Sequence, residues 1–327
     1  MTPKPTLIAF AVLSTTPAMA QLSDSAGLSG EISLSSGYTS TTSNFNTDAN
    51  ATISDNSQKG ESDSNVMVFP LGSLAYTFGS QLDKQFYVGT SREDIAVGTL
   101  ALEIGYKQQL ANGTVIDASF LPTIMSGETW ADPFQTNSAR SVTDEKGNAY
   151  RVKFSNIANS GFSLDTAYAA KDIENERSGL DSDYVSSAGL LERDATSIYV
   201  KGDYKLHLDR ATFLVPSLTY IKTDADGDAN SLTSWGGELS LFKVINHHQF
   251  ALTAGYTSKS YDASHPIYSK VREDDDFSLF AAYEYQQFMG WQNWSLISFA
   301  GYSQSDSNID FYDEDQMIFS VGVNYKF

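Results

Sequence analysis

Histidine, the side chain most often used in acid–base and nucleophilic catalysis, is scarce in this sequence. The chain has only His207, His247, His248 and His265. A catalytic histidine needs a nucleophile and an orienting group beside it, and none of the four stands in a motif that supplies both. His247 and His248 share a polar stretch, where a solvated turn is the simpler interpretation. We therefore expect no enzyme activity.

Residues 224–228 (DADGD) place carboxylates at every second position, as a calcium-binding loop does at its start. Such a loop then requires Gly at its sixth position and Glu at its twelfth, where this chain has Ala229 and Trp235. A solvated acidic loop is the simpler interpretation, with calcium as the alternative. The chain has no cysteine, which excludes disulfides and thiolate metal ligands. We expect neither a metal site nor a cofactor.

The overall charge is strongly negative, with 40 acidic and 21 basic residues. A surface that binds nucleic acid must be basic, so nucleic acid is excluded as a partner. Residues 1–20 carry one basic residue, an apolar run and a small-x-small ending at Ala18 and Ala20, which predicts a cleaved signal peptide. Cleavage would remove Lys4 and leave an exported domain of residues 21–327 with a net charge of about −20.

Most of the remaining chain alternates apolar and polar residues, as strands with one apolar face do. The clearest run sets Leu100, Leu102, Ile104 and Tyr106 against Ala101, Glu103, Gly105 and Lys107. The expected strands are residues 30–38, 66–78, 85–90, 100–107, 115–120, 150–155, 162–168, 198–206, 211–224, 234–241, 250–257, 277–286, 294–302 and 315–327. The run 294–302 is apolar on both parities, so its faces stay unassigned. Pro70 in the second strand predicts a bulge or weak pairing.

Turn and loop lengths alternate along the chain. Short segments are expected at 79–84, 110–113, 158–161, 209–210, 246–248 and 289–293. Long ones are expected at 42–64, 125–148, 173–191, 224–230, 262–273 and 303–314, with a turn at 91–94. This alternation, with an even strand count, is typical of an all-β, transmembrane, antiparallel up-and-down barrel whose termini lie on the periplasmic side. A soluble β-sandwich would usually be divided by linkers, and no Pro-rich or Gly/Ser-rich linker is present.

The last expected strand ends on two aromatic residues, Tyr325 and Phe327, on its apolar parity. This ending resembles the terminal strand of Gram-negative outer-membrane β-barrels. The resemblance implies an outer-membrane location, contact with outer-membrane lipid and lipopolysaccharide, and recognition of Tyr325 and Phe327 by the outer-membrane assembly machinery. The segments SGEISLSSGYTSTTSNFNTD, GTSREDIAVGTLALEIGYKQ and SGETWADPF resemble a Vibrio-type family of porin-like proteins of unknown function, over nearly the whole exported chain.

Charged residues on the polar parity are expected to line the barrel interior. They are Glu31, Glu103, Lys107, Asp117, Arg151, Lys153, Asp165, Lys201, Asp203, Lys205, Glu238 and Glu284. The simpler interpretation is that they solvate a channel wall. The alternative is that Arg151, Lys153, Lys201 and Lys205 form a basic wall that faces carboxylates across the pore.

The segment 125–148 is the third long outer loop and is long enough to enter a narrow lumen. Trp130 and Phe134 flank Asp132 and Pro133, so two flat faces beside a carboxylate could stack on sugars. The simpler interpretation is that the rings lie on the rim or in the membrane interface.

We therefore expect an unplugged barrel of about fourteen strands that passes small polar solutes, including oligosaccharides, passively. The alternative is a non-conducting surface barrel whose acidic loops bind lipopolysaccharide or another partner.

Overall fold

In a computed structural model, the structure describes residues 22–90, 102–122, 127–181 and 184–327. The predicted signal peptide, the turn at 91–94, and Leu100 at the start of the fourth expected strand lie outside these residues. The strands are β1 (Gly27–Thr42), β2 (Ser62–Phe78), β3 (Lys84–Thr90), β4 (Leu102–Gln109), β5 (Val115–Pro122), β6 (Gly127–Trp130), β7 (Val142–Ser155), β8 (Phe162–Ile173), β9 (Ala195–Tyr204), β10 (Leu206–His207), β11 (Thr212–Ala225), β12 (Leu232–Ile245), β13 (His248–His265), β14 (Lys270–Gln286), β15 (Trp294–Ser307) and β16 (Glu314–Lys326).

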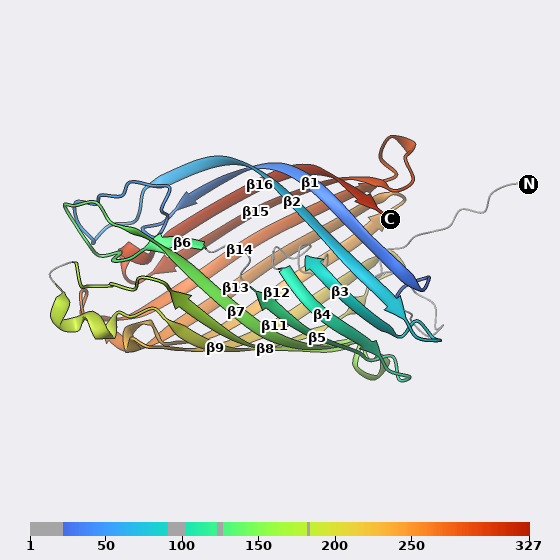
Figure 1. Cartoon of the computed structure of the whole chain (residues 1–327), viewed down its shortest axis with the longest axis horizontal. Helices are drawn as coiled ribbons and strands as arrows, with labels where there is room; N and C mark the ends of the chain where they lie inside the picture. The colour runs from blue at the N-terminus through green and yellow to red at the C-terminus, as the bar shows by residue number, and fades with distance from the viewer. Residues whose placement is uncertain (1–21, 91–101, 123–126, 182–183) are drawn as a thin grey trace, which may run out of the picture.

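These strands form one closed antiparallel barrel (Figure 1). The ring closes because β16 pairs with β1 and β9 pairs with β11. Two short strands add no position to the ring. The strand β6 pairs with β7 beyond the end of β5, and β10 pairs with β11 beyond the end of β9. The barrel therefore has the fourteen strand positions that the alternation predicts. Among the described residues, no helix is long and apolar enough to cross a membrane.

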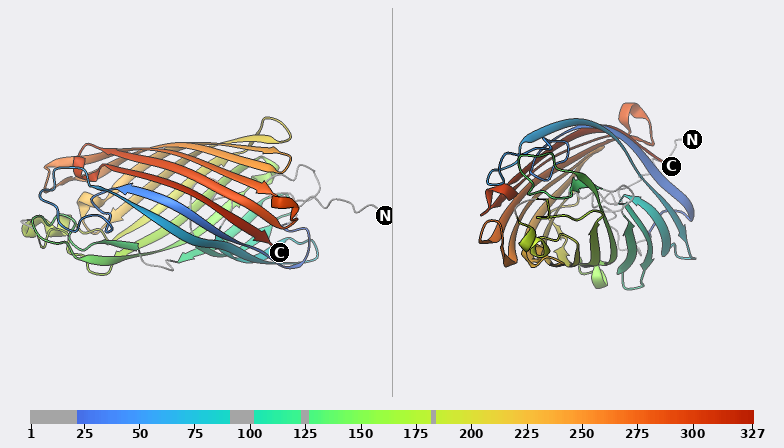
Figure 2. Two further views of the ribbon diagram at one scale, coloured as in Figure 1. Left: turned by 90° about the horizontal axis from the view of Figure 1, so that it is seen from above. Right: turned by 60° about the vertical axis from the view of Figure 1, so that its left-hand side comes forward.

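The two ends of the barrel differ (Figure 2). At the turn end lie the tight connections between β4 and β5, β12 and β13, and the other predicted short turns, together with Gly27 and Lys326. At the loop end lie the long connections 43–61, 131–141, 174–194 and 226–231. Most of the predicted loops are shorter than expected, and the largest losses occur because β7 begins at Val142, β13 reaches His265 and β15 reaches Ser307.

The strands extend beyond the predicted ones mainly at the loop end. In β13 the added stretch 258–265 is SKSYDASH, which is polar on most positions of both parities. Alternation marks a strand only where one face meets lipid, so the pattern disappears where both faces meet water. Backbone pairing continues there without any sequence signal.

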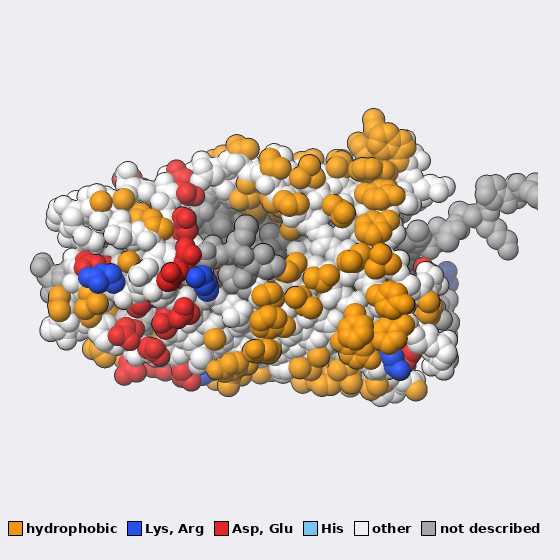
Figure 3. Space-filling view, in the orientation of Figure 1, with side chains coloured by type: hydrophobic (Ala, Val, Ile, Leu, Met, Phe, Trp, Pro, Cys, Tyr) orange, Lys and Arg blue, Asp and Glu red, His pale blue; other side chains and the backbone are white. Residues whose placement is uncertain are grey.

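On the face seen in Figure 3, apolar side chains cover the barrel wall, and an acidic band separates them from the loop end. Outward residues such as Leu218, Tyr150 and Trp235 are more than 60% exposed, while their polar strand neighbours are buried or half-buried. All backbone groups in the hydrocarbon must be paired within the protein, and a closed barrel achieves this. The chain is an outer-membrane β-barrel of the Gram-negative type.

Candidate functional site

Ion pairs join strands that lie one or two positions apart in the ring, along one part of the inner wall. Arg151 on β7 donates to both carboxylate oxygens of Asp165 on β8, at 2.9–3.0 Å from Nε, and its Nη1 lies 2.5 Å from Glu103 on β4. The two carboxylates are almost fully buried, and the Arg151 side chain is 17% exposed. Lys201 on β9 lies 3.0 Å from Glu238 on β12.

Tyr87 on β3, which the sequence analysis did not select, extends these contacts. Its hydroxyl lies 2.9 Å from Glu103 and 2.7 Å from Asp117, and Lys107 lies over its ring and 3.5 Å from Asp117. A Cβ at Gly105 would come within 2.5 Å of the Tyr87 hydroxyl, so a glycine at this position leaves the path open for the phenol. We call the set formed by Tyr87, Glu103, Lys107, Asp117, Arg151, Asp165, Lys201 and Glu238 the charge lattice.

The structure corrects the expected basic wall. Arg151 and Lys201 do not face carboxylates across the barrel, because their partners lie one or two strands away on the same side. Lys153 lies in register between Asp117 and Asp165, so it stands in the same row of opposite charges. Asp203 and Lys205 also take part in interactions, and Lys205 lies 4.4 Å over the Phe213 ring. Glu31 and Glu284 are buried near the turn end, 3.2 Å from Asn324 and 3.8 Å from Lys326 respectively.

The long connections pack together at the loop end and bury an aromatic core. Its members are Phe134, Leu191, Ile309, Phe311 and Tyr312, with Phe45, Ile53, Tyr184, Ile267 and Tyr268 packed against them. They come from connections that follow β1, β6, β8, β13 and β15, which lie on opposite sides of the ring. We call this structure the loop cap.

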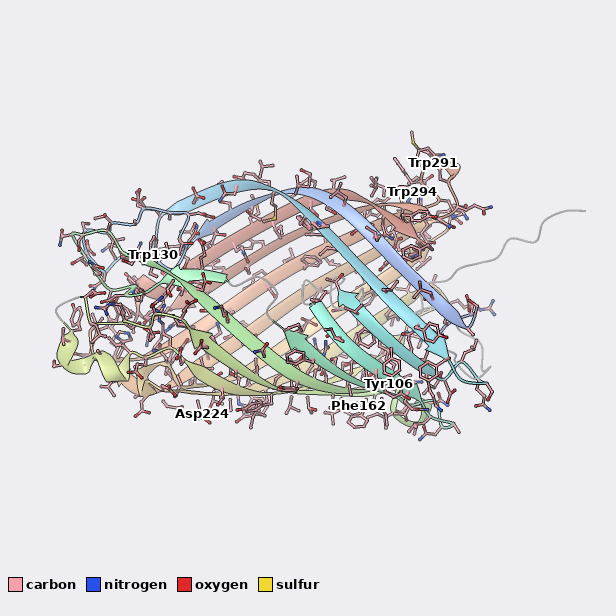
Figure 4. The ribbon with its side chains drawn as sticks, in the orientation of Figure 1. Tyr106, Trp130, Phe162, Asp224, Trp291 and Trp294 are labelled. Carbon is pink, nitrogen blue, oxygen red and sulfur yellow. The ribbon has the colours of Figure 1, made fainter. Side chains whose placement is uncertain are left out.

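Trp130, Asp132 and Phe134 belong to the loop cap. All three are 1–2% exposed, and Figure 4 places Trp130 among the loops at that end. Arg140 stacks 4.3 Å from the Trp130 ring, Phe134 packs 5.4 Å from both His265 and Phe311, and Asp132 accepts a hydrogen bond from the Asp181 backbone. Neither ring offers a free face for a sugar in this structure.

Three arginines that the sequence analysis passed over hold the loop cap. Arg140 donates to the carbonyls of Asn44, Asn50 and Ala51, and burial lowers its pKa to about 10. Arg193 pairs with Glu176 and donates to the carbonyl of Trp130. Arg272 pairs with Asp274 and lies 3.5 Å over the Tyr312 ring. No sequence pattern marks these residues, because the loops they hold, such as those of Asn44, Trp130 and Tyr312, are far away from them in the chain.

A family model described as a protein of unknown function (DUF2860) matches residues 27–326. The chain belongs to this family. The DUF2860 barrel is also similar to three solved structures. The outer membrane channel DcaP of Acinetobacter baumannii shares 11% identity (TM-score 0.45) over 92% of this chain and 96% of DcaP. An anion-selective porin from Comamonas acidovorans shares 10% identity (TM-score 0.41) over 93% of this chain and 99% of that porin. Pseudomonas aeruginosa OpdK, solved with vanillate, shares 9% identity (TM-score 0.38) over 92% of this chain and 99% of OpdK. No curated protein sequence matches the chain.

Among the described residues of the DUF2860 barrel, the side-chain hydrogen bonds do not bring a histidine together with both a nucleophile and an orienting group. His265 and His248 each bond a tyrosine hydroxyl at 2.8 Å, that of Tyr312 and of Tyr283 respectively. In the described part of the chain, no three His, Asp or Glu side chains converge on a point that could hold a metal ion. The acidic run 224–228 connects β11 to β12 beside the loop 174–194, where the Gly227 amide donates to the Glu192 carbonyl.

The DUF2860 barrel also has inward aromatic residues that the sequence analysis missed. Phe299 on β15 is 5% exposed and packs 5.8 Å from Phe280 on β14 and 5.8 Å from Phe69 on β2. The signal was the run 294–302, whose faces could not be assigned. Both of its faces are apolar because Tyr302 faces lipid while Ile297 and Phe299 face the interior.

Proposed function

We propose that this protein is a porin-like channel for the passive diffusion of small hydrophilic solutes across the outer membrane, with oligosaccharides as the finer candidate. The observation that carries the proposal is the charge lattice on the inner wall. A barrel interior packed for stability alone would not need ion pairs at side chains that water reaches, such as Lys107, which is 34% exposed. A water-filled passage keeps such groups solvated.

The chemistry of the proposed passage comes from its own side chains. The residues Glu103, Lys107, Asp117, Arg151, Lys153, Asp165, Lys201, Asp203, Lys205, Glu238 and Glu284 would line it. They alternate donors and acceptors along the wall, so a solute can exchange hydration water for protein hydrogen bonds one at a time. Trp130, Asp132 and Phe134 act in this proposal through the loop cap, which narrows the outer mouth.

Single-channel recording of the purified, reconstituted protein tests the proposal. We expect discrete conductance steps in KCl, and swelling of protein-containing liposomes in small sugars. A protein that inserts in the folded, heat-modifiable form yet conducts nothing would contradict the channel function.

The second candidate is a non-conducting barrel that presents its loops to lipopolysaccharide. The loop cap favours it, because loops from opposite sides of the ring meet and bury a common core. Acidic residues at the loop end would then hold divalent cations against lipopolysaccharide phosphates. Two results together would favour this candidate. Variants with an opened loop cap would still conduct nothing, and the protein would bind lipopolysaccharide in a magnesium-dependent way.

A further inference from the structure

Apolar side chains form a continuous row on the inner wall. From β11 to β15, each member of the row is paired in register with the next one on the neighbouring strand. The members are Phe213, Phe242, Ala251, Ala282 and Phe299. The Phe213 and Phe242 rings stack with their centroids 4.7 Å apart, and Phe213, Ala251 and Phe299 are at most 7% exposed. Leu252, next to Ala251, and Leu218, on the opposite parity of β11 from Phe213, face lipid, so this row faces the interior.

The row widens around Phe299, where Phe280 and Phe69 join it. Gly301 leaves room for one of these rings, because a Cβ at this position would lie 2.9 Å from the Phe280 ring. We call the row together with Phe280 and Phe69 the apolar stripe. An interior apolar surface of this size is unexpected if water and ions are the only cargo.

Phe299 of the apolar stripe lies across the barrel from Arg151 of the charge lattice, while β12 carries both Phe242 of the stripe and Glu238 of the lattice. From β15, which carries Phe299, to β7, which carries Arg151, the ring order has seven strand steps in either direction. The two residues also lie at similar depth. Phe299 is five residues from the turn end of β15, and Arg151 is four residues from the turn end of β7.

We propose that the turn-end half of the barrel interior holds a saccharide-selective site, in which pyranose rings place their C–H faces on the half-buried rings of the apolar stripe, those of Phe69, Phe242 and Phe280, and their hydroxyls on the charge lattice. This inference rests on the proposed channel function and names its solute class. A sugar ring has both an apolar face and a rim of hydroxyls, and each hydroxyl can donate to a carboxylate and accept from a cation.

The lattice pairs three cations with four carboxylates, and this pairing selects against singly charged solutes because each cation already has a partner. Arg151 is paired with Asp165 and Glu103, Lys107 with Asp117, and Lys201 with Glu238. An aromatic carboxylate would suit the apolar stripe but would have to displace a carboxylate already bound to its cation. A neutral hydroxylated solute can bind both partners of a pair without separating them.

Current block by cellotriose, measured on the full chain in planar bilayers, tests the site. We expect cellotriose to interrupt the KCl current at lower concentration than a linear polyethylene glycol of equal hydrodynamic size. Phe280→Leu should weaken the cellotriose block about fivefold, because it removes one stacking face. Phe277→Leu is the matched control: Phe277 lies on the same strand but is 48% exposed on the outer face, so its block should stay unchanged.

The outcomes separate this site from the channel itself. Equal block by cellotriose and polyethylene glycol, or a cellotriose block that Phe280→Leu leaves unchanged, would overturn the site while the KCl current still supports the channel. Stronger block by benzoate than by cellotriose would also overturn it, in favour of aromatic acids. Absence of any current contradicts the channel function instead.

Discussion

At the scale of single residues, Arg151 holds the charge lattice together. It binds Asp165 through two nitrogens and Glu103 through a third contact, so its loss removes the cation that joins two buried carboxylates. Arg151→Gln should lower the free energy of unfolding by roughly 2 kcal/mol, less than for a dry site because water reaches the lumen. Urea unfolding of the refolded protein measures this change.

The same substitution should also change ion selectivity. Removing one positive charge from the wall should shift the reversal potential in a KCl gradient toward cation preference. Lys146→Gln is the control, because Lys146 pairs with Glu174 on the exposed surface and both side chains are about half exposed. If both variants unfolded at the same urea concentration as the parent, Arg151 would have no structural role.

His265 makes the loop cap sensitive to acid. The ring is 1% exposed, its Nδ1 accepts from the Ile267 amide, its Nε2 faces the Tyr312 hydroxyl, and the rings of Phe134 and Tyr268 and the cation of Arg272 lie around it. Burial, with Arg272 adding to it, lowers the pKa of His265 to about 3. An opened cap would return this pKa toward its ordinary value, so the open form binds more protons between pH 6.5 and pH 3.

Cap stability should therefore fall as the pH falls through this window, by roughly 2 kcal/mol between pH 7 and pH 5. Open probability, or trypsin cleavage within the loops of intact protein, should rise over that range. His265→Gln stays neutral and should lose most of the pH dependence. A pH response that is identical in parent and His265→Gln would assign it to other groups.

At the scale of elements, the seam between β1 and β16 depends on Phe327. Its amide and carbonyl both bond to Gly30 at 2.9 Å, and a Cβ at Gly30 would come within 2.8 Å of the Phe327 ring. Deleting Phe327 removes these bonds and a lipid-facing ring, and we expect a several-fold loss of folded protein in the outer membrane. Heat-modifiability on gels measures the folded fraction, with Phe162→Leu on the lipid-facing side of β8 as the control. Normal insertion of the deletion variant would show that neighbouring pairs suffice.

The loop cap should control the size of the passage. Phe134→Ala removes a ring packed against Phe311 and His265 and should loosen the contact between opposite loops. We expect a larger or more frequently open conductance. Leu180→Ala, in the same set of loops but 43% exposed, is the control. Unchanged conductance in Phe134→Ala would place the cap outside the path of the solute.

The sequence predicts elements better than it predicts contacts between them. Alternation in strands such as β4 and β14 fixes which residues face lipid, because the membrane imposes a period of two. The fate of Trp130 and Phe134 could not be predicted in this way. Their burial depends on partners such as Phe311 and on the bonds of Arg140 to Asn44, which lie far away in the chain.

At the scale of the whole molecule, acidic residues outnumber basic ones by 40 to 21, and the basic residues of the charge lattice are already paired. We expect a weak preference for cations, which decreases with added salt because rim charges are screened beyond about 8 Å at physiological ionic strength. The reversal potential in a tenfold KCl gradient measures it. A preference for anions would show that Arg151, Lys107 and Lys201 act as free charges despite their partners.

The pairing of β1 with β16 also sets the order in which this molecule can fold. Most other neighbouring strands of the ring are joined by connections of about twenty residues or fewer, whereas Glu31 meets Lys326 across almost the full length of the chain. Contacts between such distant residues form slowly, because the chain between them must first be brought together. Until they form, the sheet has two open edges whose backbone groups cannot enter hydrocarbon unpaired. Completion of this one seam is therefore the step that couples folding to insertion.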